Sequence, residues 1–180
     1  MHNIDEIVEG CKNNNRKAQK LLYDKYAPIL MGICIRYALS TDEAQDVLQE
    51  GFFKILKQIN QFQNKGSFEG WMKRIMVNTA ITNYRKNLKH YNQYDIDDVH
   101  SDINSTSMFN SDFTHDELLK IIHELPKGYR EIFNLYAIDG YKHKEIAEML
   151  NIDIATSKSQ YSRAKKALRV KMEEISKIKV

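Results

Sequence analysis

The sequence predicts an all-α protein of two small helical domains, residues 1–90 and 114–180, joined by a flexible acidic linker over residues 91–113. Apolar side chains recur at helical spacing along both predicted domains, in stretches rich in Leu, Ile, Lys, Glu and Ala. The helix-breaking residues are scarce, with seven Gly and two Pro among 180 residues. Between the domains the helical period disappears, and Asn, Ser and Asp replace the apolar residues that a core would need.

The N-terminal domain is predicted to contain three or four helices. One covers residues 16–39, and we expect Pro28 to kink or divide it. Ser40 is then expected to cap the next helix, with Glu43 reaching back in a capping box. The apolar stripe of this second helix consists of Ala44, Val47, Leu48, Gly51, Phe52, Ile55, Leu56 and Ile59.

The opposite side of the same helix carries polar residues and one aromatic ring: Asp46, Gln49, Glu50 and Phe53. Asp46 and Glu50 are like charges one turn apart, which weakens an isolated helix by a few tenths of a kcal/mol. A partner that supplies arginines relieves this repulsion. The alternative is an acidic face that is simply solvated.

A third long helix is predicted to follow the polar loop at residues 60–66, with Ser67 as its cap, and to run to about His90. It combines aromatic rings with cations: Phe68, Trp71, Lys73, Arg74, Tyr84, Arg85 and Lys86. Aromatic rings beside a basic groove suit unstacked, single-stranded bases. The alternative is that Phe68, Trp71, Ile75 and Thr79 pack inward as core, and for Trp71 we expect the core. The residues expected at the surface are Asn78, Tyr84 and Arg85.

The C-terminal domain is predicted to contain a helix-turn-helix. A short helix from about Thr114 and a second helix, which Asp139-Gly140 ends, come first. A third covers residues 142–150 with Ile146, Ala147 and Leu150 inward, and a final helix runs from about Ala155 to Ser176. Asn151 is expected to adopt the left-handed conformation in the turn between these last two helices. A helix, a tight turn and a basic helix form the DNA-binding motif.

The start of the final helix has the residue types that read base edges. Lys158, Ser159, Ser162 and Arg163 fall on one face, and Leu168, with Tyr161 and Ala164, is expected on the inward face. Lys and Arg donate to guanine acceptors, and Ser both donates and accepts. The later cations Lys165, Lys166 and Arg169 are expected nearer phosphates. The alternative is a solvated, lysine-rich helix.

The charges are distributed unevenly, although the formal net charge is only +3. Residues 91–116 contain six Asp and no Lys or Arg, whereas residues 157–171 contain six cations and no acid. Residues 65–90 contain six cations and one acid, Glu69. Two basic segments favour two surfaces for a polyanion, with solvated helix faces as the alternative.

Several functional classes are disfavoured. The sequence has no apolar run of the ~20 residues that a membrane span needs, and we do not expect its first residues to act as a signal peptide, because they have neither a basic start nor an apolar core. Cys11 and Cys34 lie in helical patterns and are expected to be buried, reduced thiols of a cytoplasmic protein. The six His are scattered, and no phosphate loop, zinc motif or nucleophile elbow is present. We therefore expect no cofactor, no metal, no membrane insertion and no enzymatic activity.

Two sets of motifs resemble extracytoplasmic-function (ECF) RNA polymerase sigma factors of the sigma-70 family. The resemblance to region two of these proteins lies in residues 23–28, 46–50 with 52–53, 66–71, 74–75 and 78–80. The resemblance to region four lies in residues 125–126, 129–131, 141–147, 158–159 and 162–168. The resemblance spans about residues 16–90 and 114–172. The sequence departs from the family pattern at Asn151, Ala155 and Ser157, where relatives usually carry Gly, Gly and Val.

The resemblance implies a role for each domain. Residues 1–90 would bind core RNA polymerase and recognise and melt the −10 element, and residues 114–180 would recognise the −35 element. The polymerase contacts would be the β′ clamp helices and the β flap. The residues implied at the β′ clamp helices are Asp46, Gln49, Glu50 and Phe53. Those implied at single-stranded −10 DNA are Phe62, Asn64, Lys65, Ser67, Phe68, Lys73, Arg74, Asn78, Tyr84, Arg85 and Lys86. Those implied at double-stranded −35 DNA are Lys142, Lys144, Thr156, Lys158, Ser159, Ser162, Arg163, Lys165, Lys166 and Arg169.

The resemblance also implies a path and further partners. The acidic linker would thread toward the RNA exit path, and an anti-sigma factor or another recruiting protein is a further candidate partner. Two rival functions remain at this point: a helix-turn-helix regulator that never touches core polymerase, and a protein-interaction adaptor with solvated basic faces. The first leaves the face around Asp46 and the aromatic loop without a role.

Overall fold

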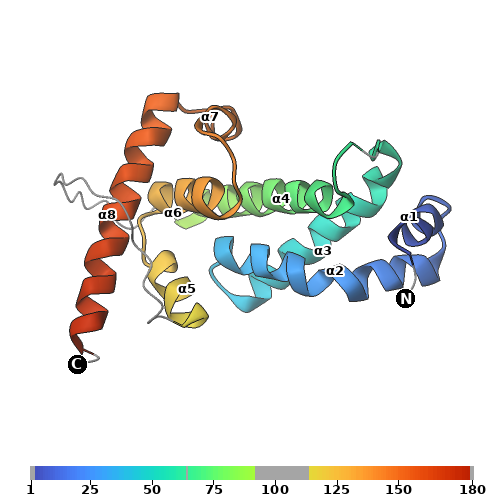
Figure 1. Ribbon diagram of the computed structural model, residues 1–180, viewed down its shortest axis with the longest axis horizontal. Coiled ribbons are helices and arrows are strands. Elements are labelled where there is room, and N and C mark those ends of the chain that lie inside the picture. Colours follow the sequence, from blue (N-terminus) through green and yellow to red (C-terminus); the bar gives the residue numbers. More distant parts are fainter. Residues whose placement is uncertain (1–2, 64, 92–113, 179–180) are drawn as a thin grey trace. The chain divides into compact units, whose positions relative to one another are not determined.

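The computed structural model describes residues 3–63, 65–91 and 114–178. The chain divides into two compact units, residues 1–95 and 96–180, which are treated separately below (Figure 1). Apart from Tyr91, the predicted linker at residues 91–113 lies outside the described residues.

The described part of the first unit is helical throughout. Its helices are α1 (Ile4–Lys12), α2 (Arg16–Tyr37), α3 (Thr41–Gln58), the 3-10 turn η1 (Ile59–Gln61) and α4 (Phe68–Tyr91). Helices α2, α3 and α4 contact one another pairwise, and α1 packs against α2 and η1 (Figure 1). The sequence predicted α2, α3 and α4, and α1 is the additional helix.

Side-chain caps fix two of these helix starts as predicted. The Ser40 hydroxyl accepts from the Glu43 N–H at 3.2 Å, and the Glu43 carboxylate accepts from the Leu39 N–H at 2.7 Å. The Ser67 hydroxyl accepts from the Gly70 N–H at 3.0 Å at the start of α4. These bonds satisfy backbone donors that have no partner within the helix.

Of the two effects expected of Pro28, division of the helix is wrong, because α2 runs unbroken from Arg16 to Tyr37 with Pro28 inside it, and a kink stays a prediction. Tyr26, Ala27 and Leu30 are buried on both sides of the proline. Packing of this turn against the rest of the unit offsets the hydrogen bond that proline removes.

The core of the first unit lies between α2, α3 and α4. Its fully buried side chains include Leu22, Leu30, Cys34, Ile55, Met72 and Met76. A Cβ built on Gly51 of α3 would meet the sulfur and terminal methyl of Met76 on α4. A larger residue at this position would therefore require the Met76 side chain to move within the core. Cys11 and Cys34 are both buried and free, as the sequence predicts.

The second unit contains α5 (His115–His123), α6 (Lys127–Phe133), the π-helical turn η2 (Asn134–Ile138), α7 (His143–Leu150) and α8 (Ile154–Ile178). Thr114 and Glu117 form a capping box at the start of α5. Asn151 ends α7 with φ 51° and ψ 51°, so its predicted left-handed conformation is confirmed. The π-helical turn at the end of the second predicted helix was not anticipated.

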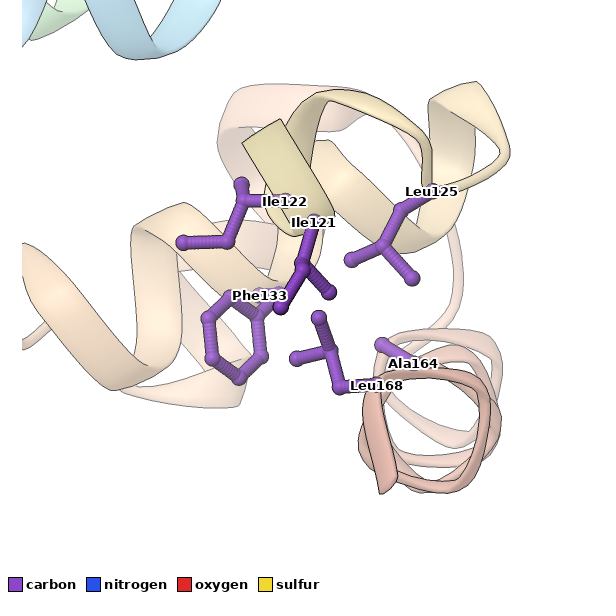
Figure 2. Packing of buried hydrophobic residues seen from close by; sticks show 6 residues of the cluster. All are labelled: Ile121, Ile122, Leu125, Phe133, Ala164 and Leu168. Atoms are coloured by element: carbon purple, nitrogen blue, oxygen red, sulfur yellow. The ribbon is translucent and has the colours of Figure 1, made fainter. Parts of the chain in front are cut away.

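The second unit has its own core, in which α5, α6 and α8 meet. Figure 2 shows this cluster, formed by Ile121, Ile122, Leu125, Phe133, Ala164 and Leu168. Ala164 and Leu168 lie on the inward face of α8 as predicted, and Tyr161 is half-buried beside them. The predicted inward residues of α7 are also buried. A salt bridge of 2.7 Å between Lys171 and Glu124 joins α8 to the end of α5.

Candidate functional site

The second unit presents a polar face on α8 directly after the tight turn from α7. Lys158, Ser159, Ser162 and Arg163 are all exposed, as their spacing predicts. The Ser159 hydroxyl donates to the Thr156 carbonyl at 3.1 Å, which leaves its oxygen lone pairs able to accept from a ligand. The arrangement suits a recognition helix in a major groove.

The other residues predicted for double-stranded DNA lie at the start of α7 and along α8. Lys142, Lys144, Lys165 and Arg169 are exposed, whereas Thr156 and Lys166 are half-buried. Lys165 lies over the Tyr161 ring, with Nζ 5.0 Å from the centroid, and Arg169 pairs with Glu173 at 2.8 Å. These contacts limit the movement of both side chains before any ligand arrives.

Helix α4 of the first unit has two stripes of residues spaced four apart. The buried stripe consists of Phe68, Met72, Met76, Ala80 and Tyr84. The exposed stripe consists of Arg74, Asn78, Thr82 and Lys86. The two stripes are offset by two residues, which is about 200° around the helix, so they occupy opposite sides. Arg74, Asn78 and Lys86 were predicted for DNA, and Asn78 lies at the surface as expected.

Tyr84 is the clearest error of the sequence analysis. Tyr84 is 2% exposed, so its predicted position at the surface is wrong. Phe68, at 8% exposure, is likewise core rather than a surface contact. Both residues belong to the buried stripe, and their four-residue register with Met72 and Met76 decides their orientation. The same spacing identifies Thr82, which the sequence analysis missed, as part of the exposed stripe.

An aromatic cluster holds the two ends of the loop before α4 together. Phe62 lies 5.0 Å from Phe68 and 5.6 Å from Trp71, measured between ring centroids. Trp71 is half-buried, and its ring stacks against Phe68 at 5.5 Å. Edge and stacked aromatic pairs of this kind contribute about 0.5–1.5 kcal/mol each. The cluster therefore anchors the loop whose exposed members are Gln63, Lys65, Gly66 and Ser67.

The remaining residues predicted for the −10 element are placed as follows. Asn64 lies outside the described residues. Ser67 is exposed but already serves as the cap of α4. Lys73 is half-buried and pairs with Glu69 at 2.7 Å, and Arg85 is half-buried. The assignment of these residues to DNA stays a prediction.

Helix α3 exposes the four residues predicted for polymerase. Asp46, Gln49 and Glu50 are exposed, and Phe53 exposes 67% of its surface. Phe53 is the most exposed of the large hydrophobic residues described, and aromatic rings are frequent anchors in protein–protein interfaces.

Glu50 is already engaged within the unit. Its carboxylate pairs with Lys54 at 2.6 Å and accepts a hydrogen bond of 2.7 Å from the Asn83 amide on α4. Lys54 also lies 3.4 Å from the Thr79 hydroxyl. The bonds from Lys54 and Asn83 lower the pKa of Glu50. A cation from a partner would therefore meet Asp46 with less competition than Glu50, and Glu50 contributes to joining α3 and α4.

Two further properties of the described residues bear on function. Among them, no group of three or more His, Cys, Asp or Glu is placed to hold a metal ion. None of the described helices has the length and apolar character that a membrane span requires.

Comparisons with known proteins agree with this division of the chain. A family described as Sigma-70 region 2 matches residues 22–90, and a family described as Sigma-70, region 4 matches residues 115–168. The ECF RNA polymerase sigma-E factor of Haemophilus influenzae is 27% identical, over 94% of this chain and 95% of that protein. The RNA polymerase sigma-H factor of Pseudomonas aeruginosa is 26% identical, over 91% of this chain and 90% of that protein.

Solved structures share the fold. CnrH in complex with the cytosolic domain of CnrY superposes with a TM-score of 0.53 at 18% identity, over 93% of this chain and 96% of that chain. The sigma factor RpoE of Bartonella quintana, solved with the anti-sigma factor NepR, gives 0.57 at 21% identity, over 86% and 96%.

The two helical units, the basic helix-turn-helix and the two matched regions define a DNA-binding transcription factor that associates with RNA polymerase. More narrowly, the chain belongs to the ECF group of the sigma-70 family, whose members direct promoter-specific initiation of transcription. Because both sigma-70 regions are matched, a regulator that consists only of a helix-turn-helix no longer accounts for residues 22–90.

Proposed function

We propose that this sigma factor reads the −35 element of its promoters with α8 and the −10 element with α4 and the loop before it. In this proposal α3 binds the β′ clamp helices of core polymerase through Asp46, Gln49 and Phe53, and the second unit lies on the β flap. The protein acts in the cytoplasm as a non-catalytic subunit. An anti-sigma factor or a recruiting protein is its further partner, as NepR is for the Bartonella quintana relative.

The observation that carries the proposal is the exposed polar face of α8 next to the turn at Asn151. A lysine and an arginine at the ends of this face supply donors for guanine, and two serines lie between them. Nearby exposed cations such as Lys144 add affinity for phosphates without sequence information.

The role of α4 in strand opening is supported by its exposed stripe. Arg74 and Lys86 can contact phosphates, and the Asn78 amide can pair with the edge of an extruded base. Extrusion of a base from the duplex costs a few kcal/mol, so the surface that receives the base must offset this cost with stacking and hydrogen bonds. Phe62, at the start of the loop, is half-buried and can offer part of its ring for stacking.

Binding and opening are tested with reconstituted holoenzyme on a panel of promoters. Lys158→Ala and Arg163→Ala should each weaken −35 binding by about 1–3 kcal/mol and relax the base preference at one position. The matched control Lys144→Ala should weaken binding to all sequences about equally and reduce the salt slope by about one. If all three variants behave alike across the panel, α8 does not read bases.

Strand opening is tested with Asn78→Ala combined with Arg74→Ala. Ser67 and Phe68 are left unchanged because they cap and pack α4. The variant should form closed complexes normally but lose permanganate reactivity of unpaired thymines, and a pre-melted bubble template should restore part of its activity. Asn60→Ala, an exposed position on η1, is the control. Normal opening of duplex promoters by the α4 variant contradicts the proposed role of the exposed stripe.

A further inference from the structure

A partly buried hydrogen bond joins the two helices of the helix-turn-helix. Nδ1 of His143, the first residue of α7, lies 2.9 Å from the hydroxyl oxygen of Ser157 on α8. The Ser157 side chain is 0% exposed. A hydroxyl removed from water costs about 1–3 kcal/mol when it is left without a hydrogen-bond partner. The bond to His143 therefore favours the position of α8 in which Ser157 reaches this ring.

Two tyrosines hold the His143 ring in place. Tyr136, from the π-helical turn η2, stacks on it with centroids 4.2 Å apart and planes inclined by 14°. Tyr161, one turn after Ser157 on α8, meets it at 5.9 Å and 61°, and also contacts Tyr136 at 4.5 Å. The ring cluster of Tyr136, His143 and Tyr161 therefore draws on η2, α7 and α8, and together with the hydrogen bond it contacts α8 at two successive turns.

These two contact points alternate with the base-reading residues. Ser157 directly precedes Lys158 and Ser159, and Tyr161 directly precedes Ser162 and Arg163. A rotation of α8 by about 10° would move side-chain ends roughly 6 Å from its axis by about 1 Å. A shift of that size lengthens a hydrogen bond of about 2.9 Å beyond its useful range. Base reading therefore depends on whatever fixes the rotation of this helix.

We propose that His143 and Ser157 are positioning residues for promoter recognition: their hydrogen bond, supported by the ring cluster, fixes the rotation of α8 in the major groove. This inference rests on the proposed function of α8 as the −35 reader. It assigns a role in base discrimination to two side chains that need not touch DNA.

The chemistry of His143 fits this role. Burial, together with the ammonium group of Lys158, lowers the pKa of His143. The ring is therefore neutral at pH 7, with one nitrogen donating and the other accepting, and its bond to a hydroxyl adds no charge beside the base-reading face. The Ser157 hydroxyl has a local alternative acceptor in the carbonyl of Asp153, which already accepts the Ser157 N–H at 3.0 Å. That alternative should let the fold survive loss of the histidine while the link to α7 disappears.

The test uses holoenzyme reconstituted with full-length variants and a set of promoters carrying each single substitution in the −35 element. Ser157→Ala removes the hydroxyl, His143→Phe keeps a stacking ring without a hydrogen-bonding atom, and His143→Asn keeps a polar atom near the place of Nδ1. Ser176→Ala, an exposed serine on the same helix, is the matched control. Equilibrium binding at one fixed salt concentration gives the ratio of affinities for the best and the substituted sites, and thermal melting of each free chain monitors stability.

Ser157→Ala and His143→Phe should reduce this ratio by about 3- to 10-fold, part of the discrimination that well-placed base contacts supply. Binding to DNA without a −35 element should change by less than about two-fold, because phosphate contacts tolerate the shift. His143→Asn should retain most of the discrimination, and Ser176→Ala all of it.

The outcomes separate the inference from the function on which it rests. If the wild type discriminates among −35 bases and Ser157→Ala and His143→Phe discriminate equally well, the positioning role is refuted and the reading role of α8 stands. If those variants lose specific and non-specific binding together, in step with a lower melting temperature, the pair is merely structural and the inference is again refuted. A wild-type holoenzyme without any −35 preference overturns both.

Discussion

Phe52 and Phe53 are neighbours on α3 with opposite environments, and their substitution by alanine separates folding from polymerase binding. Phe52 is 5% exposed and meets the Tyr23 ring edge-on at 4.9 Å, whereas Phe53 is 67% exposed. Phe52→Ala should lower the free energy of unfolding by about 3–5 kcal/mol, as truncation of a buried aromatic ring does. Phe53→Ala should change it by less than about 1 kcal/mol, because little of its ring is buried in the free protein.

The effect of Phe53→Ala on polymerase binding follows from the exposed area. An aromatic side chain buries roughly 200 Å² when it is fully covered, so two thirds of it is about 130 Å². At about 25 cal/mol per Å², a partner that covers this area gains about 3 kcal/mol, or roughly 100-fold in affinity.

The assay has two arms. Urea unfolding of the free chain gives stability, and competition against a labelled wild-type chain gives the dissociation constant for core polymerase. Phe53→Ala should fold normally and bind core about 100-fold more weakly. A Phe53→Ala chain that competes as well as wild type refutes the assignment of this face to polymerase, and a large loss of stability would show that Phe53 is a core residue.

Three further predictions concern stability and reactivity. Tyr84→Ala should cost about 3–5 kcal/mol in urea unfolding, whereas Asn78→Ala should stay within about 0.5 kcal/mol; equal effects would contradict the two-stripe description of α4. The pKa of Glu50 is lowered in the folded state. The ionised carboxylate therefore contributes its full share of folding stability above the unfolded-state pKa of about 4.3, and this share is lost as the pH falls through the folded-state pKa. On acidification, wild type should therefore lose more stability than Glu50→Gln. The difference should not exceed about 1 kcal/mol, because the ion pair is partly exposed. If the stability of the two chains depends on pH in the same way, the bonds from Lys54 and Asn83 do not stabilise the fold. Burial raises the pKa of Cys34 to about 12, so a thiol reagent at pH 8 should label it far faster in denaturant than in the native chain, and rapid native labelling would contradict its burial.

Signals confined to a few neighbouring residues predicted the fold well. The caps at Ser40 and Ser67 and the left-handed Asn151 depend on chemistry within about four residues, and all three are confirmed. The inward faces of α3, α7 and α8 follow from apolar spacing in the same way. The candidate sites lie on the exposed faces of the helices, away from these apolar stripes.

The errors arise where two local signals compete or where a contact spans the sequence. Tyr84 lies beside Arg85 and Lys86, which favours a nucleic-acid surface, but its register with Met76 and Ala80 buries it. Pro28 normally interrupts a helix, and tertiary packing overrides that tendency. The bond between His143 and Ser157 joins residues 14 positions apart across a turn, and no period or motif indicates it.

The two stripes of α4 restrict how this domain can change over evolutionary time. Each residue advances an α-helix by about 100°, so deleting one residue, Val77 for example, would turn every later position by that angle. Ala80 and Tyr84 would leave the core, and Lys86 would leave the exposed stripe. Lineages can therefore alter DNA preference here by substituting residues along the exposed stripe, whereas insertions and deletions of single residues within α4 should be eliminated by selection. Insertions and deletions should be tolerated only in segments that carry neither stripe. Among the described residues near α4, this segment is the loop between Phe62 and Ser67.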